Sequence, residues 1–326
     1  MDLRQLEAVL AIANHGSFSS AAAALGTVQS NVSGRIAKLE RELDATLIDR
    51  ATGTLTDEGQ IVVTRARRVL GELESMMDDV VATRSEVTGI VRSGMIGTTG
   101  RWFIPKVFDE LTKRHPRIRL FLTEGTTSTM EPQLLQGSID MAILTLPVQA
   151  EELFVEPMFE EELALVVASD HPLAATYGRS REPIPLKALK DLKLLLPLPG
   201  TSLRDEIDSS LAPSGITPQA IIELDGLRTL ASLVFDGYGP GILPATAVPE
   251  HLRGKFRLLT LEGFPRRRVG LVTRKHGLPS APSRAIKEIF LSIAQDVEHL
   301  PVGIHPIGSE QHTSYQDHGA LRSPLA

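Results

Sequence analysis

The chain has 326 residues, enough for two or three domains, and its 42% apolar and 23% charged residues are ordinary for a globular protein. It contains no cysteine, which excludes disulfides, thiolate metal sites and cysteine nucleophiles. The formal net charge of −6 excludes a uniformly basic nucleic-acid coat protein. No stretch approaches the roughly 18 consecutive apolar residues of a membrane span. Its first residues do not form an export signal, so we expect a soluble, cytoplasmic protein without membrane contacts.

Residues 1–56 are predicted to form short helices joined by tight turns. Asp2 and Gln5 have the spacing of a capping box at the start of the first helix. A third helix is expected from Gln29 to about Leu43, after a tight turn, and this order of elements predicts a helix-turn-helix. The apolar positions expected to face the core from the third helix are Val32, Ile36 and Leu39.

The outward face of the third helix carries side chains that can pair with base edges. Glutamine and asparagine pair with adenine and arginine with guanine, whereas hydroxyl groups can bond to several bases. A polar face that only meets water has the same composition, so this face alone leaves both interpretations open. The candidate DNA-binding residues are Thr27, Gln29, Ser30, Asn31, Ser33, Arg35 and Lys38, with Arg50 beyond the helix.

A long helix is predicted from Asp57 to about residue 88. Thr56 suits its N-cap, and acidic residues at the next two positions favour the positive helix end. A helix of about 30 residues, or about 45 Å, with a narrow apolar stripe is typical of a coiled-coil seam between two chains. The expected seam residues are Val62, Ala66, Val69, Leu73, Met76 and Val80.

Beyond Gly89 the pattern alternates between strands and helices, which predicts an α/β domain. No periodicity follows Leu300, so we expect residues 301–326 to be a disordered tail. Strands are predicted over Ile90–Gly97, Ile118–Glu124, Asp140–Leu146, Glu162–Ala168 and Arg268–Thr273, and helices over Trp102–Arg114, Pro132–Gln136 and residues 285–297.

The N-terminal residues resemble the signature of LysR-type transcriptional regulators. Three later segments, Gly89–Gly94, Leu135–Ile143 and Gly237–Pro244, resemble recurrent segments of the same family, so the resemblance covers nearly the whole chain. The N-terminal positions that carry it are Gly16-Ser17-Phe18, Ala21-Ala22, Leu25, Gln29, Val32-Ser33, Ile36, Leu39-Glu40, Leu43, Leu47, Arg50 and Leu55-Thr56-Gly59.

This resemblance implies an all-α N-terminal part followed by an α/β domain. The implied function is a ligand-responsive regulator, activator or repressor, that binds double-stranded promoter DNA as a homodimer or homotetramer and contacts RNA polymerase. No cofactor, metal or enzymatic activity is implied. The implied units are a winged helix-turn-helix at 1–56, a linker and dimerisation helix at 57–88, and an effector domain at 89–300. Its two lobes resemble those of periplasmic binding proteins, with lobe one at 90–161 plus 269–300 and lobe two at 162–268.

Four features depart from the family pattern. Val28 stands where the family usually has a serine or threonine cap, for which Thr27, one residue earlier, is the candidate replacement. Ser30 stands where proline is common, Gly34 stands where arginine is frequent, and the wing at residues 50–55 is short. Residues 1–60 carry five basic and eight acidic side chains. Because each neutralised phosphate adds to non-specific affinity, we expect weak non-specific DNA binding and a shallow dependence on salt.

Hydroxyl clusters follow the predicted strands and begin the helices after them. Helix N-termini and strand ends of α/β sheets favour small anions, although each cluster could also serve only as a helix cap. Together with the resemblance, the clusters predict a small polar or anionic metabolite, such as an organic acid, bound between the lobes with no acidic cluster nearby. The candidate effector-binding residues are Thr98, Thr99, Thr127, Ser128, Thr145, Thr201 and Ser202.

Other motifs carry less weight. The glycines of Gly237–Gly241 have the wrong spacing for a dinucleotide site, and Arg266-Arg267-Arg268 precedes a strand, which favours solvated or interface charge. Three histidines near the C-terminus are too widely spaced for a metal site, and no catalytic motif supports an enzyme. The competing hypothesis is a cytoplasmic small-solute-binding protein with a degenerate DNA-binding domain, which leaves residues 1–88 unexplained. The three histidines are His305, His312 and His318.

Overall fold

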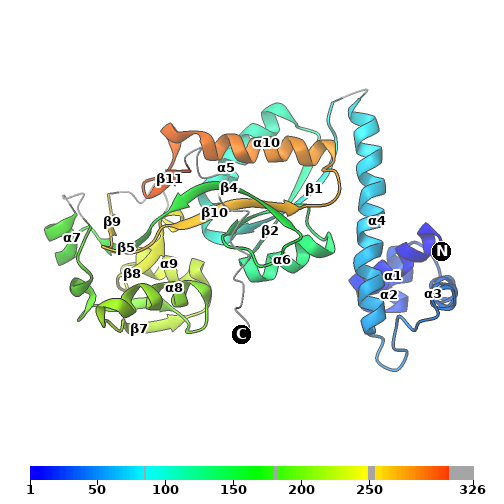
Figure 1. The fold of residues 1–326 in the computed structure, drawn as a ribbon, viewed down its shortest axis with the longest axis horizontal. Helices are drawn as coiled ribbons and strands as arrows, with labels where there is room; N and C mark the ends of the chain where they lie inside the picture. Colours follow the sequence, from blue (N-terminus) through cyan, green and yellow to red (C-terminus); the bar gives the residue numbers. More distant parts are fainter. Residues whose placement is uncertain (84–85, 179–182, 249–253, 308–326) are drawn as a thin grey trace, which may run out of the picture.

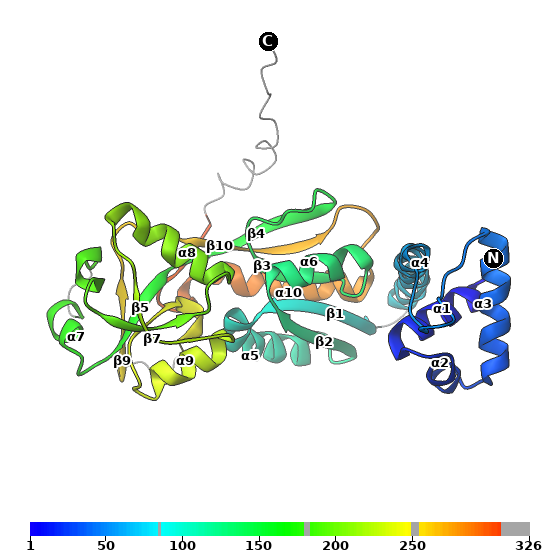
Figure 2. The same ribbon diagram turned by 90° about the horizontal axis from the view of Figure 1, so that it is seen from below.

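The computed structural model describes residues 1–83, 86–178, 183–248 and 254–307. The molecule is elongated: an N-terminal helical bundle, a long helix and two α/β lobes follow one another along its length (Figures 1 and 2). The predicted fold class is confirmed, with a helix-turn-helix region followed by a two-sheet α/β domain.

The N-terminal bundle consists of α1 (Leu3–His15), α2 (Phe18–Ala24) and α3 (Gln29–Leu43). The predicted capping box of α1 is present, because Asp2 accepts from the main chain of Gln5 and Gln5 accepts from the main chain of Asp2. A single bridge between Ile48 and Leu55 closes the small wing after α3. The predicted core positions Val32, Ile36 and Leu39 are fully buried. In α1, Val9 is also fully buried, and Ile12 is nearly so.

The long helix α4 (Asp57–Ala82) has 26 residues and separates the bundle from the lobes (Figures 1 and 2). Thr56 caps it as predicted, with its hydroxyl accepting from the main-chain N–H of Gly59 at 3.0 Å. Its first turns pack on α1 through Val63 and Ala66, which are buried in the core of the bundle. The helix ends at Ala82, whereas the sequence analysis placed its end at residue 88.

Lobe one is built on a six-stranded sheet in the order β11-β4-β10-β3-β1-β2. The neighbours β2, β1 and β3 are parallel, and the other pairs are antiparallel. Phe103, Phe159 and Phe290 are fully buried in its core. The elements are β1 (Gly89–Ile96), α5 (Gly97–Arg114), β2 (Ile118–Gly125), α6 (Thr127–Gln136), β3 (Met141–Thr145), β4 (Leu153–Glu161), β10 (Arg267–Arg274), α10 (Ala281–Gln295), the short helix η5 (Val297–His299) and β11 (Ile304–Pro306).

Lobe two is built on a five-stranded sheet in the order β7-β6-β8-β5-β9. Its strands β7, β6 and β8 are parallel to one another, whereas β5 pairs antiparallel with β8 and β9. The elements are β5 (Leu163–Ala168), α7 (Pro172–Tyr177), η1 (Leu186–Leu189), β6 (Lys193–Pro197), α8 (Ser202–Leu211), η2 (Ala212–Ser214), β7 (Gln219–Leu224), α9 (Leu227–Phe235), β8 (Gly241–Pro244), η3 (Ala245–Ala247) and β9 (Phe256–Thr260).

Two connections join the lobes. Glu162 alone separates β4 from β5, and residues 261–266 lead from β9 back to β10. Strand β10 begins at Arg267, so lobe one resumes two residues earlier than expected. The Glu162 carboxylate accepts from the Thr260 hydroxyl at 3.0 Å and lies 2.7 Å from His305 Nε2, so both connections are tied to the C-terminal strand.

The expectation of disorder throughout residues 301–326 is wrong for the C-terminal strand. Ile304–Pro306 pairs antiparallel with β4, and Ile304 is buried in the core of lobe one. Three residues are too few to show an alternating pattern, and this strand depends on a partner more than 140 positions earlier. Residues 308–326, and with them His312 and His318, lie outside the described residues.

Candidate DNA-binding surface and ligand cleft

Helix α3 lies on the side of the bundle that faces away from α4 and the lobes (Figures 1 and 2). Val28 is its N-cap and provides no side-chain hydrogen bond. Thr27 does not replace that cap, because its hydroxyl accepts from Asn31 Nδ2 at 2.9 Å. Gln29 is held by the Ser19 hydroxyl, which donates to Gln29 Oε1 at 3.0 Å. These contacts orient side chains at the start of an open helix face.

The other candidate DNA-binding residues lie along α3 and in the wing. Ser30 and Lys38 are exposed, and Ser33 and Arg35 are half-buried on the flank of the helix. Arg50 pairs with Glu40 of α3 at 3.2 Å. The same Glu40 carboxylate accepts from the main-chain N–H groups of residues 47 and 48, so one side chain places both Arg50 and the start of the wing.

The apolar stripe predicted on α4 is uncovered within a single chain. Val69, Met76 and Val80 are 45%, 56% and 50% exposed, and Leu73 is half-buried. Val62 and Ala66 differ from this prediction because both pack against the core of the bundle. The first three turns of α4 are used for contact with the bundle, so the open stripe begins further along the helix.

A cavity of about 950 Å³ lies between the lobes. Six of the seven candidate effector residues line it; the exception is Thr99, whose side chain is fully buried and whose hydroxyl has no partner. Neighbouring positions on a helix point about 100° apart, so Thr98 faces the cavity and Thr99 faces the interior. The lining candidates are Thr98, Thr127, Ser128 and Thr145 from lobe one and Thr201 and Ser202 from lobe two.

The threonine hydroxyls have structural partners as well as access to the cavity. Thr127 donates to the carbonyl of Thr145 at 2.9 Å, which ties the start of α6 to the end of β3. Thr201 caps α8 through the main-chain N–H of Arg204 and donates to the carbonyl of Leu198 at 2.8 Å. The interpretation as helix caps therefore holds for Thr201, and the same residue forms part of the cavity wall.

Arg267 is the residue that the sequence interpretation missed, because it was assigned to solvated or interface charge. Its side chain is 12% exposed and lines the cavity, and Nη2 donates to the Thr145 hydroxyl at 2.8 Å. It pairs with Glu206 of α8 at 3.1 Å and with the fully buried Glu161 at 3.3 Å. The available signal was the alternation of side chains along an extended segment. Arg266, just before β10, and Arg268, the second residue of β10, both pair with Glu160 instead.

The expectation of no acidic cluster near the hydroxyls is wrong. Glu124 pairs with Arg228 of α9 across the cavity, and Glu206 pairs with Arg267. Burial raises the pKa of Glu206 above its ordinary value, an effect that the nearby Arg267 opposes and Glu161 reinforces. Two ion pairs therefore bridge the lobes. Lobe one provides the carboxylate of the first pair, Glu124, and the arginine of the second, Arg267. The carboxylates that line the cavity are Glu124, Glu131, Glu206 and Asp225.

Among the described residues, no group of three or more His, Asp or Glu side chains is arranged to hold a metal ion. No helix in that part of the chain is long and apolar enough to cross a membrane.

Comparison with known protein families matches both halves of the chain. The model named "Bacterial regulatory helix-turn-helix protein, lysR family" matches residues 3–60, and the model "LysR substrate binding domain" matches residues 84–294. The chain belongs to the LysR family. It is a ligand-responsive, DNA-binding transcriptional regulator, and the match over residues 3–60 supports this function over a solute-binding protein.

Similar LysR regulators cover nearly the full length. A probable hydrogen peroxide-inducible genes activator from Streptomyces viridosporus is 33% identical over 308 residues, or 93% of this chain and 96% of that protein. The DNA-binding transcriptional dual regulator OxyR of Escherichia coli (strain K12) is 32% identical over 289 residues, or 87% and 92%. These relatives are regulators of transcription.

Solved structures show the same fold. A cysteine-to-aspartate variant of full-length OxyR from Pseudomonas aeruginosa has a TM-score of 0.73 at 24% identity, covering 95% of this chain and 99% of that one. A cysteine-to-serine variant of OxyR from Corynebacterium glutamicum with hydrogen peroxide bound has a TM-score of 0.53 at 30% identity, covering 90% and 91%.

Proposed function

We propose that this LysR-family regulator binds promoter DNA as a homodimer or homotetramer and responds to a small polar metabolite held reversibly between its lobes. Duplex DNA is bound by α3 and the wing, and the second chain is bound along the open stripe of α4. The protein acts in the cytoplasm, where RNA polymerase is its further partner.

The cavity between the lobes is the observation that carries this proposal. Its volume of about 950 Å³ lies at the upper end of the range typical of small-molecule sites. Hydroxyl groups from both lobes and the guanidinium of Arg267 line it, so a ligand there would contact both lobes at once. A ligand that binds one arrangement of the two lobes more tightly than the other shifts the equilibrium between those arrangements.

Reversible binding, and not thiol oxidation, is the sensing chemistry that this chain supports. Of the relatives named above, the Streptomyces protein is called a probable hydrogen peroxide-inducible genes activator, and both solved structures are of OxyR cysteine variants. This chain has no cysteine, and the oxidation steps that lead to sulfenic acid or a disulfide begin at a cysteine thiolate. The cavity wall offers the hydroxyls of Thr201 and Ser202, which cannot undergo those steps.

The charges of the cavity indicate which metabolites fit. Arg267 favours an acidic group, whereas Glu124, Glu206 and Asp225 favour hydrogen-bond donors or a cation. We therefore propose an organic acid that also carries a hydroxyl or amino group.

A thermal-shift screen of hydroxy acids, amino acids and plain carboxylates tests this function, followed by calorimetry of the compound that stabilises the protein. We expect Thr98→Val and Thr201→Val to weaken binding of that compound by about tenfold, or about 1.4 kcal/mol. Thr112→Val, on the exposed side of α5, is the matched control and should bind normally. Equal affinity in all three variants would place the ligand elsewhere.

DNA binding is tested separately by footprinting the region upstream of the gene. Peroxide provides the comparison, since the footprint should be unchanged by hydrogen peroxide and changed by the stabilising compound. A peroxide-dependent footprint would contradict the proposed sensing chemistry.

A further inference from the structure

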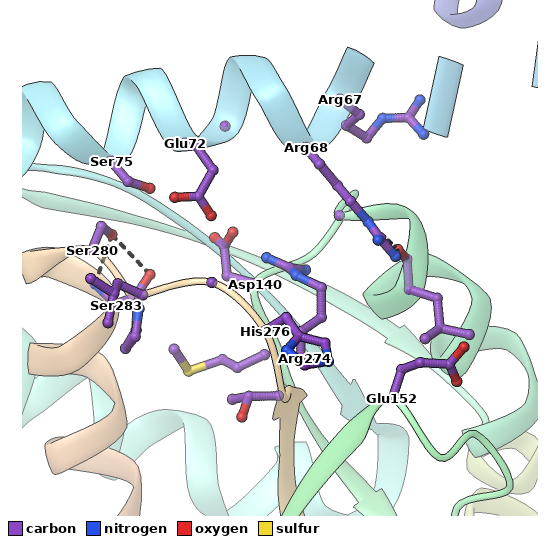
Figure 3. Close-up of a pocket in the computed structure, with 18 of the residues that line it drawn as sticks. Arg67, Arg68, Glu72, Ser75, Asp140, Glu152, Arg274, His276, Ser280 and Ser283 are labelled. Carbon is purple, nitrogen blue, oxygen red and sulfur yellow. Dashed lines mark hydrogen bonds between the residues drawn. The ribbon is translucent and has the colours of Figure 1, made fainter. Parts of the chain in front are cut away.

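Helix α4 contacts lobe one along a polar seam, shown in Figure 3. A cavity of about 320 Å³ lies between the helix and the lobe, lined on one side by Arg68 and Glu72 and on the other by Asp140 and Arg274. Arg68 reaches past this cavity to α6, where its Nε donates to the carbonyl of Leu135 at 2.9 Å. The contact joins the helix next to the DNA-binding bundle with an element of lobe one.

Helix α6 extends from the ligand cleft to this seam. Thr127 and Ser128, at its N-terminal end, line the cleft, whereas Leu135, in its last turn, accepts from Arg68. Leu135 also lines both the cleft and the seam cavity. A helix of this length spans about 15 Å, and Pro132 lies within it. Because the same helix lines the cleft and contacts Arg68, we expect a displacement at its cleft end to move the carbonyl that Arg68 binds.

Strand β10 makes the same connection. Its first residue, Arg267, lies in the cleft, and its last residue, Arg274, lies at the seam. Arg274 Nη1 donates to the carbonyls of Leu134 and Ile139, both at 2.9 Å. Cationic side chains at the C-terminal end of a helix are favourable because they bind carbonyls that have no partner within the helix. The end of α6 is thus held by β10 on one side and by α4 on the other.

Two consecutive arginines of α4 contact the N-terminal bundle and lobe one, respectively. Arg67 Nη2 donates to Asn14 Oδ1 at 3.2 Å, at the end of α1 in the bundle. Arg68, the next residue, binds α6. The same turn of α4 therefore contacts both the DNA-binding bundle and the helix that lines the ligand cleft.

A second contact between α4 and lobe one involves α10, an element that does not line the cleft. Asp79 accepts from the main-chain N–H of Ala281 at 2.7 Å and pairs with Arg284 at 3.2 Å, both in α10. The cleft-lining residues come from other elements than α10. Asp79 therefore anchors α4 on lobe one, whereas Arg68 contacts an element that meets the ligand.

We propose that Arg68 is the positioning residue through which the ligand cleft sets the orientation of the DNA-binding half, by way of its hydrogen bonds to the end of α6. This inference rests on the proposed function, because it assigns the route between the two sites.

Linkage makes the proposal testable without the ligand. Because coupling between two sites is reciprocal, a cleft that affects DNA binding through α6 implies that DNA binding in turn affects the cleft and the α6 residues that line it. Hydrogen exchange of residues 126–131 is measured in the full chain with and without the duplex found by footprinting. We expect the duplex to change their exchange rates by about threefold or more, because exchange reports the local opening equilibrium of this segment.

The test variant is Arg68→Met, which keeps the length of the side chain and removes its donors. We expect it to bind the duplex within about threefold of wild type and to lose the exchange change at residues 126–131. Arg65→Met, an exposed arginine of the same helix, is the matched control and should keep it. Arg68→Lys keeps a charged donor and should restore part of it. Exchange of β3 shows whether each variant remains folded.

Two outcomes would overturn the proposal: no duplex-dependent change at residues 126–131 in wild type, or a change that persists in folded Arg68→Met. If Arg68→Met unfolds lobe one, the comparison of wild type with Arg68→Lys decides. The proposal is then overturned by two results together. The exchange response of Arg68→Lys equals that of wild type, and its crystal structure shows no hydrogen bond from the substituted side chain to the Leu135 carbonyl. Failure of the proposed function gives a different result, namely no specific duplex for the wild-type protein.

Discussion

Arg267 of β10 and Glu206 of α8 lie 3.1 Å apart and join the two lobes across the ligand cleft. The same guanidinium faces Glu161, which is fully buried and accepts from the Thr246 hydroxyl at 2.7 Å. Arg267 therefore has two roles, as an arginine that lines the cleft together with Arg228, and as the countercharge of a buried carboxylate.

Removal of Arg267 should destabilise the protein. Arg267→Met leaves Glu161 buried without its countercharge, which typically costs about 3–5 kcal/mol. The double variant Glu161→Gln with Arg267→Met should recover most of that loss in urea unfolding. Arg266→Met is the control: its side chain is 48% exposed, and an exposed pair contributes about 0–1 kcal/mol. A loss for Arg267→Met no larger than for Arg266→Met would contradict the assigned role.

The seam carboxylate Asp140 should make stability depend on pH. Burial raises its pKa above the ordinary value, although its carboxylate accepts from the Arg92 main-chain N–H and lies near Arg274. A carboxyl group whose folded pKa is raised favours folding while protonated, and that contribution is lost as pH rises through the folded pKa.

Asp140→Asn keeps an acceptor for Arg92 and removes the buried charge. We expect it to be more stable than wild type at pH 7.5 and the difference to shrink towards pH 4, as measured by thermal unfolding. Asp109→Asn, an exposed change on α5, should show no such pH-dependent gain. A constant difference across this pH range would show that Asp140 is not the titrating group.

Sequence-specific DNA binding should depend on α3. Ser33→Ala and Arg35→Ala should each weaken binding to the footprinted duplex by about 1–3 kcal/mol, because each removes a candidate base contact. Binding to an unrelated duplex should change less. Fluorescence anisotropy measures both affinities, and Lys113→Ala on α5 is the control. Intact specific binding in both variants would show that α3 docks by another face.

Arg50 should act on all duplexes alike. Arg50→Ala removes a candidate phosphate contact, so it should weaken specific and non-specific binding equally and reduce the salt slope by about 1. Its pairing with Glu40 places the guanidinium beside α3. Anisotropy titrations at several salt concentrations measure the slope, and an unchanged slope would mean that Arg50 only supports the wing.

The open stripe of α4 should hold two chains together. Leu73→Asp places a charge in an apolar seam, which is costly when the charge has no partner. We expect loss of the dimer and of tight DNA binding, with folded lobes, by light scattering and anisotropy. Val297→Asp, at a 57% exposed valine near the end of lobe one, should leave the oligomer unchanged. An unchanged oligomer for Leu73→Asp would reject this seam.

Local patterns in the sequence predicted much of this protein. Two helix caps, at Asp2 and Thr56, and the apolar period of α3 depend on residues three or four positions apart. The sequence alone was therefore sufficient to place them. The alternation of strands and helices after Gly89 and the hydroxyls at the strand ends have the same local origin. The family resemblance added the order of the domains.

The tertiary structure decided which side of each element meets which partner. Sequence spacing placed Thr98 and Thr99 together, but only packing shows that one faces the cleft and the other the core. Arg267 looked like surface charge until the return of β10 brought it beside Glu206, some sixty positions earlier. The contact between Arg68 and Leu135 likewise joins residues 67 positions apart. Such pairings depend on how distant segments pack, because burial and charge complementarity arise only when the chain is folded.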